Sequence, residues 1–314
     1  MNVEQQTSEL APIVMIVFNR PDHTGRVLKA LSENTLASDS LLYIFSDAPR
    51  GLQDVEAVNA VRALIHQASG FKRVTLVEQE HNYGCSRNVL SSISDVLKKH
   101  DRCIVVEDDV MPYSLFLTYM NKALSVYEND PTVFSIGAYS HSFKLPAHYH
   151  EETFLLNRTC SWGWGTWSSA WEKINLDQTV LDVAMADSSI RKAFTKSGDD
   201  VLRIYKNAPG IWDLRICFQL WSLGLKTLFP VQPMVTNIGR DGSGTHFNQG
   251  TLHSSDELLV PTRIPELHPL KDVDEEVRIA FNKSFHKPAW RILTTRVAKR
   301  LGLYDGLLKC FNAR

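Results

Sequence analysis

The sequence predicts an α/β protein with a mixed, mostly parallel central sheet flanked by helices. Short apolar runs alternate with helical patterns throughout the first half of the chain, which is typical of strand–helix units that feed a parallel sheet. Three of these runs end directly on polar residues. The length of 314 residues and the hydrophobic content of 44% are sufficient for a full-sized core.

The first two strand–helix units follow from the spacing of apolar residues. Residues 13–18 form an apolar run that stops at Asn19-Arg20-Pro21, and a helix is expected to begin near Thr24. Leu41 to Phe45 is the second expected strand. Residues 54–69 carry apolar side chains at helical spacing and predict the second helix.

The third and fourth strands are expected at residues 74–77 and 103–106. Ser86 is expected to cap a helix that continues through Leu97. The run 103–106 is short and apolar without alternation, so it predicts a buried central strand. It ends at Glu107-Asp108-Asp109, and ligands of open α/β sheets bind at such carboxyl ends.

The second half of the chain is less regular. It contains an aromatic segment at 162–171, an expected helix at 212–223, and a loop at 237–250 rich in Gly, Asn and His. The tail from Pro288 onward predicts an amphipathic basic helix, which either covers the domain or lies on an anionic membrane surface.

These patterns suggest three regions. Residues 1–11 are expected to be disordered, and residues 266–314 are expected to form a helical, basic extension. Residues 12–265 are expected to form the main domain, with a nucleotide-binding half at 12–137 and an acceptor-side half at 138–265.

Composition restricts the partners and the compartment. The formal net charge of -1 gives no reason to expect nucleic acid. Five scattered cysteines without a CxxC pair indicate reduced thiols. The polar N-terminus does not resemble a signal peptide, and no run is long enough to span a membrane, so a cytoplasmic protein is expected, with peripheral membrane contact through the tail as an option.

The acidic triplet at 107–109 predicts a metal site. Clustered carboxylates where a buried strand emerges are costly unless a cation or ligand compensates them. Mg²⁺ and Mn²⁺ prefer oxygen ligands and often take only one or two from the protein, with the rest supplied by phosphate oxygens and water. The alternative is a solvated acidic turn.

Several motifs together resemble a known family. The segment Val105 to Val110, followed by Phe116 and Tyr119, resembles the metal-binding segment of N-acetylglucosaminyltransferase I and its relatives, which are inverting glycosyltransferases of the GT-A fold. Trp212-Asp213 is similar to the family element that carries the general base. Gly242 to Phe247 is similar to its C-terminal glycine and histidine loop.

The resemblance runs in order from about residue 13 to residue 250. The chain departs from the family pattern because no N-terminal membrane anchor precedes the domain and because Leu214, not a second acid, follows Asp213. The first departure favours a bacterial relative in the cytoplasm. The second weakens the assignment of Asp213 as general base, and its alternative role is that of an acid stabilised by the helix dipole.

The resemblance implies a role for each candidate residue. Asp213 would be the general base, and Asp109 and His246 would bind Mn²⁺ or Mg²⁺. Donor binding would involve the polar residues that follow the strands, with Glu107 and Asp108 on donor sugar and ribose and Asp47 on the base, in the set Asn19, Arg20, Asp47, Arg87, Glu107 and Asp108.

Three candidate donor-binding residues, Arg20, Arg87 and Trp164, are indicated on chemical grounds. Arg20 and Arg87 suit a pyrophosphate through their bidentate donors, although each could equally form a surface ion pair. Trp164, which lies between Gly163 and Gly165, could stack on a sugar face, whereas large aromatic residues at such spacing more often belong to a core.

The sequence thus predicts transfer of a hexose or N-acetylhexosamine from a UDP-sugar to a hydroxyl of a surface polysaccharide or lipid-linked glycan. A sugar nucleotidyltransferase is an alternative, but it would need a glycine-rich loop after the first strand. A catalytically inactive carbohydrate-binding protein is another, and it would be expected to have lost the acidic triplet or Trp212-Asp213.

Overall fold

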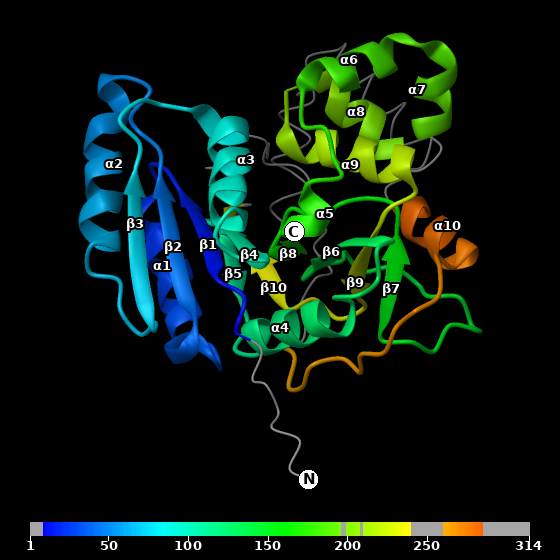
Figure 1. The fold of residues 1–314 in the computed structure, drawn as a ribbon, viewed down its shortest axis with the longest axis horizontal. Helices are drawn as coiled ribbons and strands as arrows, with labels where there is room; N and C mark the ends of the chain where they lie inside the picture. Colours follow the sequence, from blue (N-terminus) through cyan, green and yellow to red (C-terminus); the bar gives the residue numbers. More distant parts are fainter. Residues whose placement is uncertain (1–8, 196–198, 208–209, 240–259, 285–314) are drawn as a thin grey trace, which may run out of the picture.

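The computed structural model describes residues 9–195, 199–207, 210–239 and 260–284 (Figure 1). Within them, eight strands form one sheet in the order β3-β2-β1-β4-β8-β6-β9-β7. The strands of this sheet are β1 (Ile13–Val17), β2 (Leu41–Ser46), β3 (Arg73–Glu78), β4 (Arg102–Glu107), β6 (Val133–Gly137), β7 (Thr153–Leu156), β8 (Trp164–Trp167) and β9 (Lys226–Pro230). A two-stranded sheet pairs β5 (Val110–Pro112) with β10 (Val235–Asn237).

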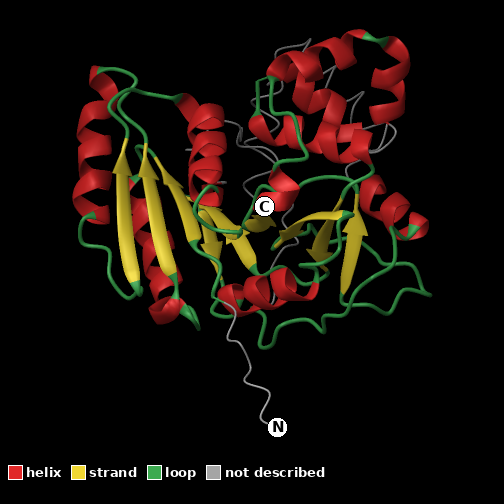
Figure 2. Cartoon of the chain, in the orientation of Figure 1, coloured by secondary structure: helices red, strands yellow, loops and turns green. Residues whose placement is uncertain are grey.

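The sheet is mixed and mostly parallel, which confirms the predicted fold class. Strands β3, β2, β1 and β4 are mutually parallel, β8 is antiparallel to both β4 and β6, and β7 is antiparallel to β9. Helices lie on both sides of the strands (Figure 2). Those of the first half are α1 (Pro21–Ser32), the short η1 (Ala37–Asp39), α2 (Leu52–Ile65), α3 (Gly84–Leu97) and α4 (Phe116–Val126).

The strand order reverses between β1 and β4. The chain steps outward from β1 to β2 and β3, and α3 then returns it to β4 on the other side of β1. Because such crossovers are right-handed, α1 and α2 share one face and α3 covers the opposite face. The carboxyl ends of β1 and β4 therefore meet at the switch point where open α/β sheets bind ligands.

A group of helices in the second half builds a smaller core of its own. It consists of α6 (Gln178–Ala186), α7 (Ser188–Thr195), α8 (Asp199–Asn207) and α9 (Trp212–Leu223), with α5 (Ser168–Trp171) between it and the sheet (Figure 1). Helix α9 belongs to both cores: Leu214 and Phe218 pack among the helices, whereas Trp212 and Ile216 pack against the sheet.

The far end of the sheet is covered by α10 (Glu275–Lys283). Its Val277 and Phe281 are buried in an aromatic cluster with Phe154 of β7 and Phe229 of β9. This helix lies in the predicted C-terminal extension, so part of that extension packs on the sheet. The predicted tail helix from residue 288 lies outside the described residues.

Two expectations about local structure are wrong. Residues 9–11 were expected to be disordered, but Ala11 is buried and its backbone N–H donates to Asn121 Oδ1 over 2.9 Å. Ser86 was expected to cap α3, but α3 begins at Gly84 and the Ser86 hydroxyl donates to the Gly210 carbonyl oxygen over 2.7 Å. No helix in the described part of the chain is long and apolar enough to cross a membrane.

Candidate functional site

The acidic triplet lies at the switch point of the sheet. Glu107 is the last residue of β4 and pairs with Ile16 of β1, while Asp108 and Asp109 form the turn into β5. Asp108 is only 4% exposed. Glu107 and Asp109 are half-buried, so the triplet is not a fully solvated acidic turn.

Arg20 is the cation that faces these acids. It follows β1 directly, and its guanidinium binds Asp108 through two nitrogens and Asp109 Oδ2 through Nη1 at 3.0 Å. Burial alone would lower the pKa of Arg20, but the charges of Asp108 and Asp109 raise it above its ordinary value. Two segments 88 residues apart are thus joined by charge-assisted bonds.

Glu107 carries an unfavourable charge in this setting. Burial, followed by the charges of Asp109, Asp108 and Asp213, raises the pKa of Glu107 well above its ordinary value, and Arg20 offsets only part of this effect. Burial likewise raises the pKa of Asp108 despite Arg20. Asp213, in the first turn of α9, therefore belongs to the same electrostatic cluster as the triplet.

The strand β10 brings a second segment onto Asp109. The Asn237 amide donates to Asp109 Oδ1 over 3.3 Å, and the Ile238 N–H donates to the Asp109 carbonyl oxygen over 2.8 Å. A Cβ at Gly239 would lie 2.4 Å from Asp109 Oδ2, so a larger residue there would displace the Asp109 carboxylate. His246, the other predicted metal ligand, lies outside the described residues, seven positions after Gly239.

Asp47 holds the start of α3. Its buried carboxylate accepts the backbone N–H groups of Ala48, Tyr83 and Gly84 and the amide of Asn82, at 2.8 to 3.1 Å. Both oxygens are engaged by the protein itself. Asp47 therefore positions the start of α3, and its contact with a nucleotide base remains a prediction.

Asn19 also has a partner within the protein. Its amide donates to Asp54 Oδ1 over 2.8 Å, and Arg50 binds the same carboxylate. The hydrogen bond from Arg50, helped by that from Asn19, lowers the pKa of Asp54 to about 2. Asn19 lies at the carboxyl end of β1 as predicted, and its contact with a donor remains a prediction.

The expectation that Trp164 stacks on a sugar is wrong. Its side chain is fully buried in β8, with its ring stacked on Trp212 at a centroid distance of 5.8 Å. Trp164 lies opposite Val105 of β4. The ring therefore anchors the beginning of α9, and with it Asp213, beside the acidic end of β4.

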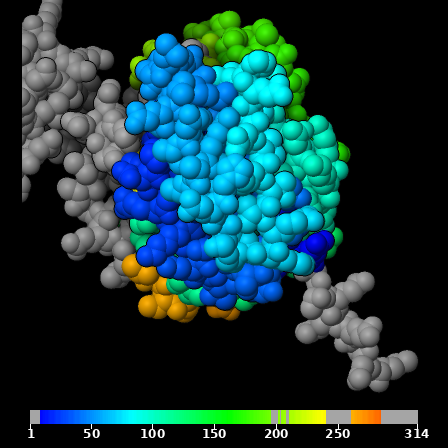
Figure 3. Space-filling model, turned by 90° about the vertical axis from the view of Figure 1, so that its left-hand side faces the viewer, coloured from blue at the N-terminus to red at the C-terminus, as the bar shows by residue number. Residues whose placement is uncertain are grey.

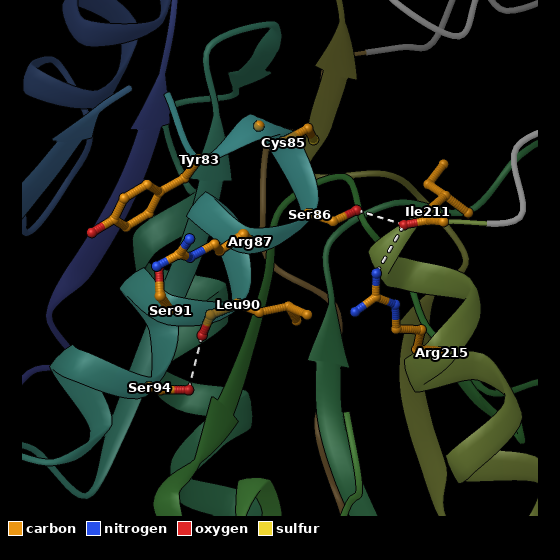
Figure 4. Close-up of a pocket in the computed structure, with 11 residues that line it drawn as sticks. Tyr83, Cys85, Ser86, Arg87, Leu90, Ser91, Ser94, Ile211 and Arg215 are labelled. Atoms are coloured by element: carbon orange, nitrogen blue, oxygen red, sulfur yellow. Dashed lines mark hydrogen bonds between the residues drawn. The ribbon is translucent and has the colours of Figure 1, made fainter. Parts of the chain in front are cut away.

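Arg87 lies apart from the acids, in the wall of a neighbouring cavity (Figure 4). Its guanidinium stacks over the Tyr83 ring at 4.1 Å from the centroid. Arg87 has no ion pair with an acid among the described residues, so the surface ion pair that was its alternative role is absent there.

The carboxylates are suited to a divalent cation that is completed by a ligand. No three His, Cys, Asp or Glu side chains in the described ranges are arranged to hold a metal by themselves. One or two carboxylates nevertheless suffice when phosphate oxygens and waters supply the other ligands. Four acids face one arginine here, Glu107, Asp108, Asp109 and Asp213 against Arg20, so the excess negative charge favours such a cation.

Sequence reasoning missed that Asn237 and Gly239 lie against Asp109 and that the charges of the cluster act on Cys85. The glycine- and asparagine-rich composition of 237–250 marked a loop, but nothing in it indicated that the strand before it pairs with β5. Cys85 gave no signal, because its proximity to the acids depends on the crossover of α3.

No protein family matches the chain, and no curated protein is detectably similar in sequence. Among solved structures, a mannosyltransferase from Pyrobaculum calidifontis in complex with GDP-Man and Mn²⁺ is 14% identical over 49% of this chain and 44% of its own, with a TM-score of 0.35. S. aureus TarS is 13% identical over 50% of this chain and 28% of its own, with a TM-score of 0.33.

Mouse xyloside xylosyltransferase 1 in its apo form is 10% identical over 70% of this chain and 84% of its own, with a TM-score of 0.38. The chain spans less than half the length of the mannosyltransferase and of TarS. Because all three TM-scores are low, the activity of this chain has to be inferred from its own site.

Proposed function

We propose that the chain is an inverting glycosyltransferase that moves a hexose or N-acetylhexosamine from a UDP-sugar to an acceptor hydroxyl. The observation that carries the proposal is the convergence of Arg20, the triplet 107–109 and Asp213 at the switch point of the sheet. A surface polysaccharide or lipid-linked glycan made at the cytoplasmic side of the membrane is the proposed product.

The donor would bind with its diphosphate between β1 and β4. Arg20 offers a planar guanidinium to the phosphate oxygens, and Asp108 holds that guanidinium in place. Asp109, with His246 as a further ligand, would hold Mn²⁺ or Mg²⁺, which supplies positive charge for the departing diphosphate, and Glu107 would contact the donor sugar.

Asp213 would accept the proton of the acceptor hydroxyl. As that oxygen forms its bond to the anomeric carbon, the bond from that carbon to the diphosphate breaks and the diphosphate leaves with the electron pair. Displacement from the opposite face inverts the anomeric centre. The stacked rings of Trp164 and Trp212 hold the first turn of α9 in position for this step.

The proposal differs from nucleotidyl transfer at the first loop. A glycine-rich phosphate loop would be needed after β1, but Asn19 and Arg20 lead directly into α1, which begins at Pro21. Where a nucleotidyltransferase would have this loop, the present chain has Arg20, which binds Asp108 and Asp109.

The test is binding of UDP with and without Mn²⁺, measured by thermal shift and calorimetry. We expect UDP to stabilise the wild type only when Mn²⁺ is present, because a ligand that binds the folded state raises its stability. Asp109→Ala should abolish this effect. Asp213→Asn should keep it and lower turnover of a UDP-sugar by on the order of 100-fold or more.

Asp95→Asn is the matched control, because Asp95 is an exposed acid on α3 whose ion pair with Lys98 is far from the cluster. Metal-independent binding of UDP, or full turnover by Asp213→Asn, would contradict the proposal. Stabilisation by a nucleoside triphosphate together with a sugar 1-phosphate would instead identify a sugar nucleotidyltransferase.

A further inference from the structure

A cavity of about 680 Å³ lies beside the acidic cluster, between the N-terminal turns of α3 and α9 (Figure 4). Its volume is in the range of small-molecule sites and suits one or two sugar rings. Its walls combine the Tyr83 ring and the apolar Leu90 and Ile211 with the hydroxyls of Ser91 and Ser94.

Two arginines line this cavity from opposite sides. Arg87 projects from α3 and stacks on Tyr83. Arg215 projects from α9 and donates to the carbonyl oxygens of Gly210, over 3.1 Å, and Leu176, over 3.3 Å. Neither arginine forms an ion pair with an acid in the part of the chain that the structure describes.

The positive charge of Arg215 is incompletely compensated. Its Nε is buried and has no hydrogen-bond partner among the described residues. Burial lowers the pKa of Arg215, and the charges of Asp182 and Asp177 offset only part of that effect. A guanidinium with a buried donor that has no partner is stabilised by negative charge placed beside it, which an anionic ligand in the cavity would supply.

The cavity borders the proposed catalytic cluster. Cys85 lines it, and desolvation followed by the charges of Glu107 and Asp213 raises the pKa of Cys85 to about 12. Asp213 and Arg215 are two residues apart on α9, so they point roughly 200° apart around the helix. The first turn of α9 thus presents an acid to the cluster and a cation to the cavity.

We propose that this cavity is the acceptor site and that the acceptor is a sugar with a phosphate or carboxylate group, which Arg87 and Arg215 bind. This inference rests on the proposed glycosyltransferase function. With its anionic group held between the two arginines, the acceptor extends past Cys85 and brings a hydroxyl to Asp213.

The test is calorimetric binding of glucose 6-phosphate and glucuronic acid, with glucose as the neutral probe. We expect glucose to bind more weakly than the anionic sugars by about ten-fold to 100-fold, the value of one or two charge-assisted hydrogen bonds. Arg87→Gln and Arg215→Gln should each weaken binding of the anionic sugars about ten-fold and leave that of glucose unchanged. The anionic sugar that binds more tightly shows whether the cavity prefers a phosphate or a carboxylate group.

Arg73→Gln is the matched control, because Arg73 is an exposed arginine on β3, an edge strand of the sheet. Figure 3 shows the side of the molecule on which the N-terminal part of the chain lies. It should bind all three sugars as the wild type does. Arg215 also bonds two carbonyl oxygens, so replacing it could disturb the fold. Arg87 is exposed, so Arg87→Gln tests the same proposal without that risk. Arg215→Lys, which keeps the charge, should restore part of the affinity.

Equal affinity for glucose and glucose 6-phosphate, or unchanged binding by both glutamine variants, would overturn the inference. Displacement of the anionic sugars by UDP with Mn²⁺ would also overturn it, because the cavity would then belong to the donor site. If UDP does not bind but the arginine variants still lose the anionic sugars, the proposed function fails and the cavity is an anionic-sugar site of another kind.

Discussion

At the scale of single residues, the site places more negative charge in the interior than its own cation compensates. Arg20 binds Asp108 and Asp109 but leaves the half-buried Glu107 without a compensating cation beside three other acids. Such an arrangement lowers the stability of the free protein and raises its affinity for positive charge. The acidic cluster is therefore a place where stability and ligand binding oppose one another.

Glu107→Gln is expected to stabilise the fold near neutral pH by on the order of 1 kcal/mol or more. The raised pKa of Glu107 means that ionisation destabilises the folded state as the pH rises above the ordinary glutamate value. The gain should therefore shrink as the pH falls toward about 4, where glutamate is protonated in both states. Urea denaturation at several pH values measures it.

The same variant should bind UDP with Mn²⁺ more weakly than the wild type. Glu56→Gln is the control, because Glu56 is an exposed glutamate on α2, and its effect on stability should stay within about 0.5 kcal/mol. A Glu107→Gln protein less stable than the wild type near pH 7 would contradict this account of the cluster.

Asp54→Asn is expected to destabilise the protein near neutral pH. The hydrogen bonds from Arg50 and Asn19 lower the pKa of Asp54 to about 2, so its stabilising contribution is present above about pH 4 and is lost as the pH falls toward 2. The difference between variant and wild type should disappear in acid. Asp39→Asn, at an exposed position, should show no such pH dependence.

The positions of the acids at the site could be predicted from the sequence more readily than the contacts that each residue makes. Glu107, Asp108 and Asp109 follow a buried strand, which local patterning can reveal. The role of Asp47 depends on the turn before α3, and the burial of Trp164 depends on α9 packing over β8. Such long-range contacts leave no local signal.

At the scale of elements, the strands and helices of the first half agree with the predicted ranges to within a few residues, because their apolar spacing is regular. The helix expected at 212–223 has those bounds in the structure. Capping was harder to predict: Ser86 offers a suitable hydroxyl, but the carboxylate of Asp47, from the end of β2, reaches the start of α3 instead.

Asp47→Ala is expected to destabilise the protein by roughly 2–3 kcal/mol, because the N–H groups of Tyr83 and Gly84 lose a charged acceptor in a buried setting. Chemical denaturation measures the loss. Asp95→Ala, at the exposed other end of α3, should cost less than about 1 kcal/mol. Similar losses in the two variants would mean that Asp47 does not hold the helix.

At the scale of the whole molecule, one sheet joins the region of the switch point to the region of the aromatic cluster. The parallel strands β3, β2, β1 and β4 form the switch point, while β6, β7 and β9 lead to the aromatic cluster beneath α10. The sequence predicted the parallel part, because strand–helix alternation implies it. The order of the later strands could not be predicted, since long and irregular connections separate them.

Phe281→Ala is expected to destabilise the fold by about 3–5 kcal/mol, because Phe281 is buried against Phe143, Phe154 and Phe229. The added stability that UDP and Mn²⁺ confer should remain as in the wild type, since the site lies at the switch point. Ile279→Ala, at an exposed position of α10, is the control for stability. A lost response to UDP would show that the two regions are coupled.

The carbonyl oxygen of Gly210 links α3 and α9. It accepts hydrogen bonds from both Ser86 and Arg215, so one atom joins the two walls of the cavity (Figure 4). The separation of the two walls therefore depends on this junction. Replacing Ser86 with alanine is expected to release one wall and to let bulkier ligands enter the cavity.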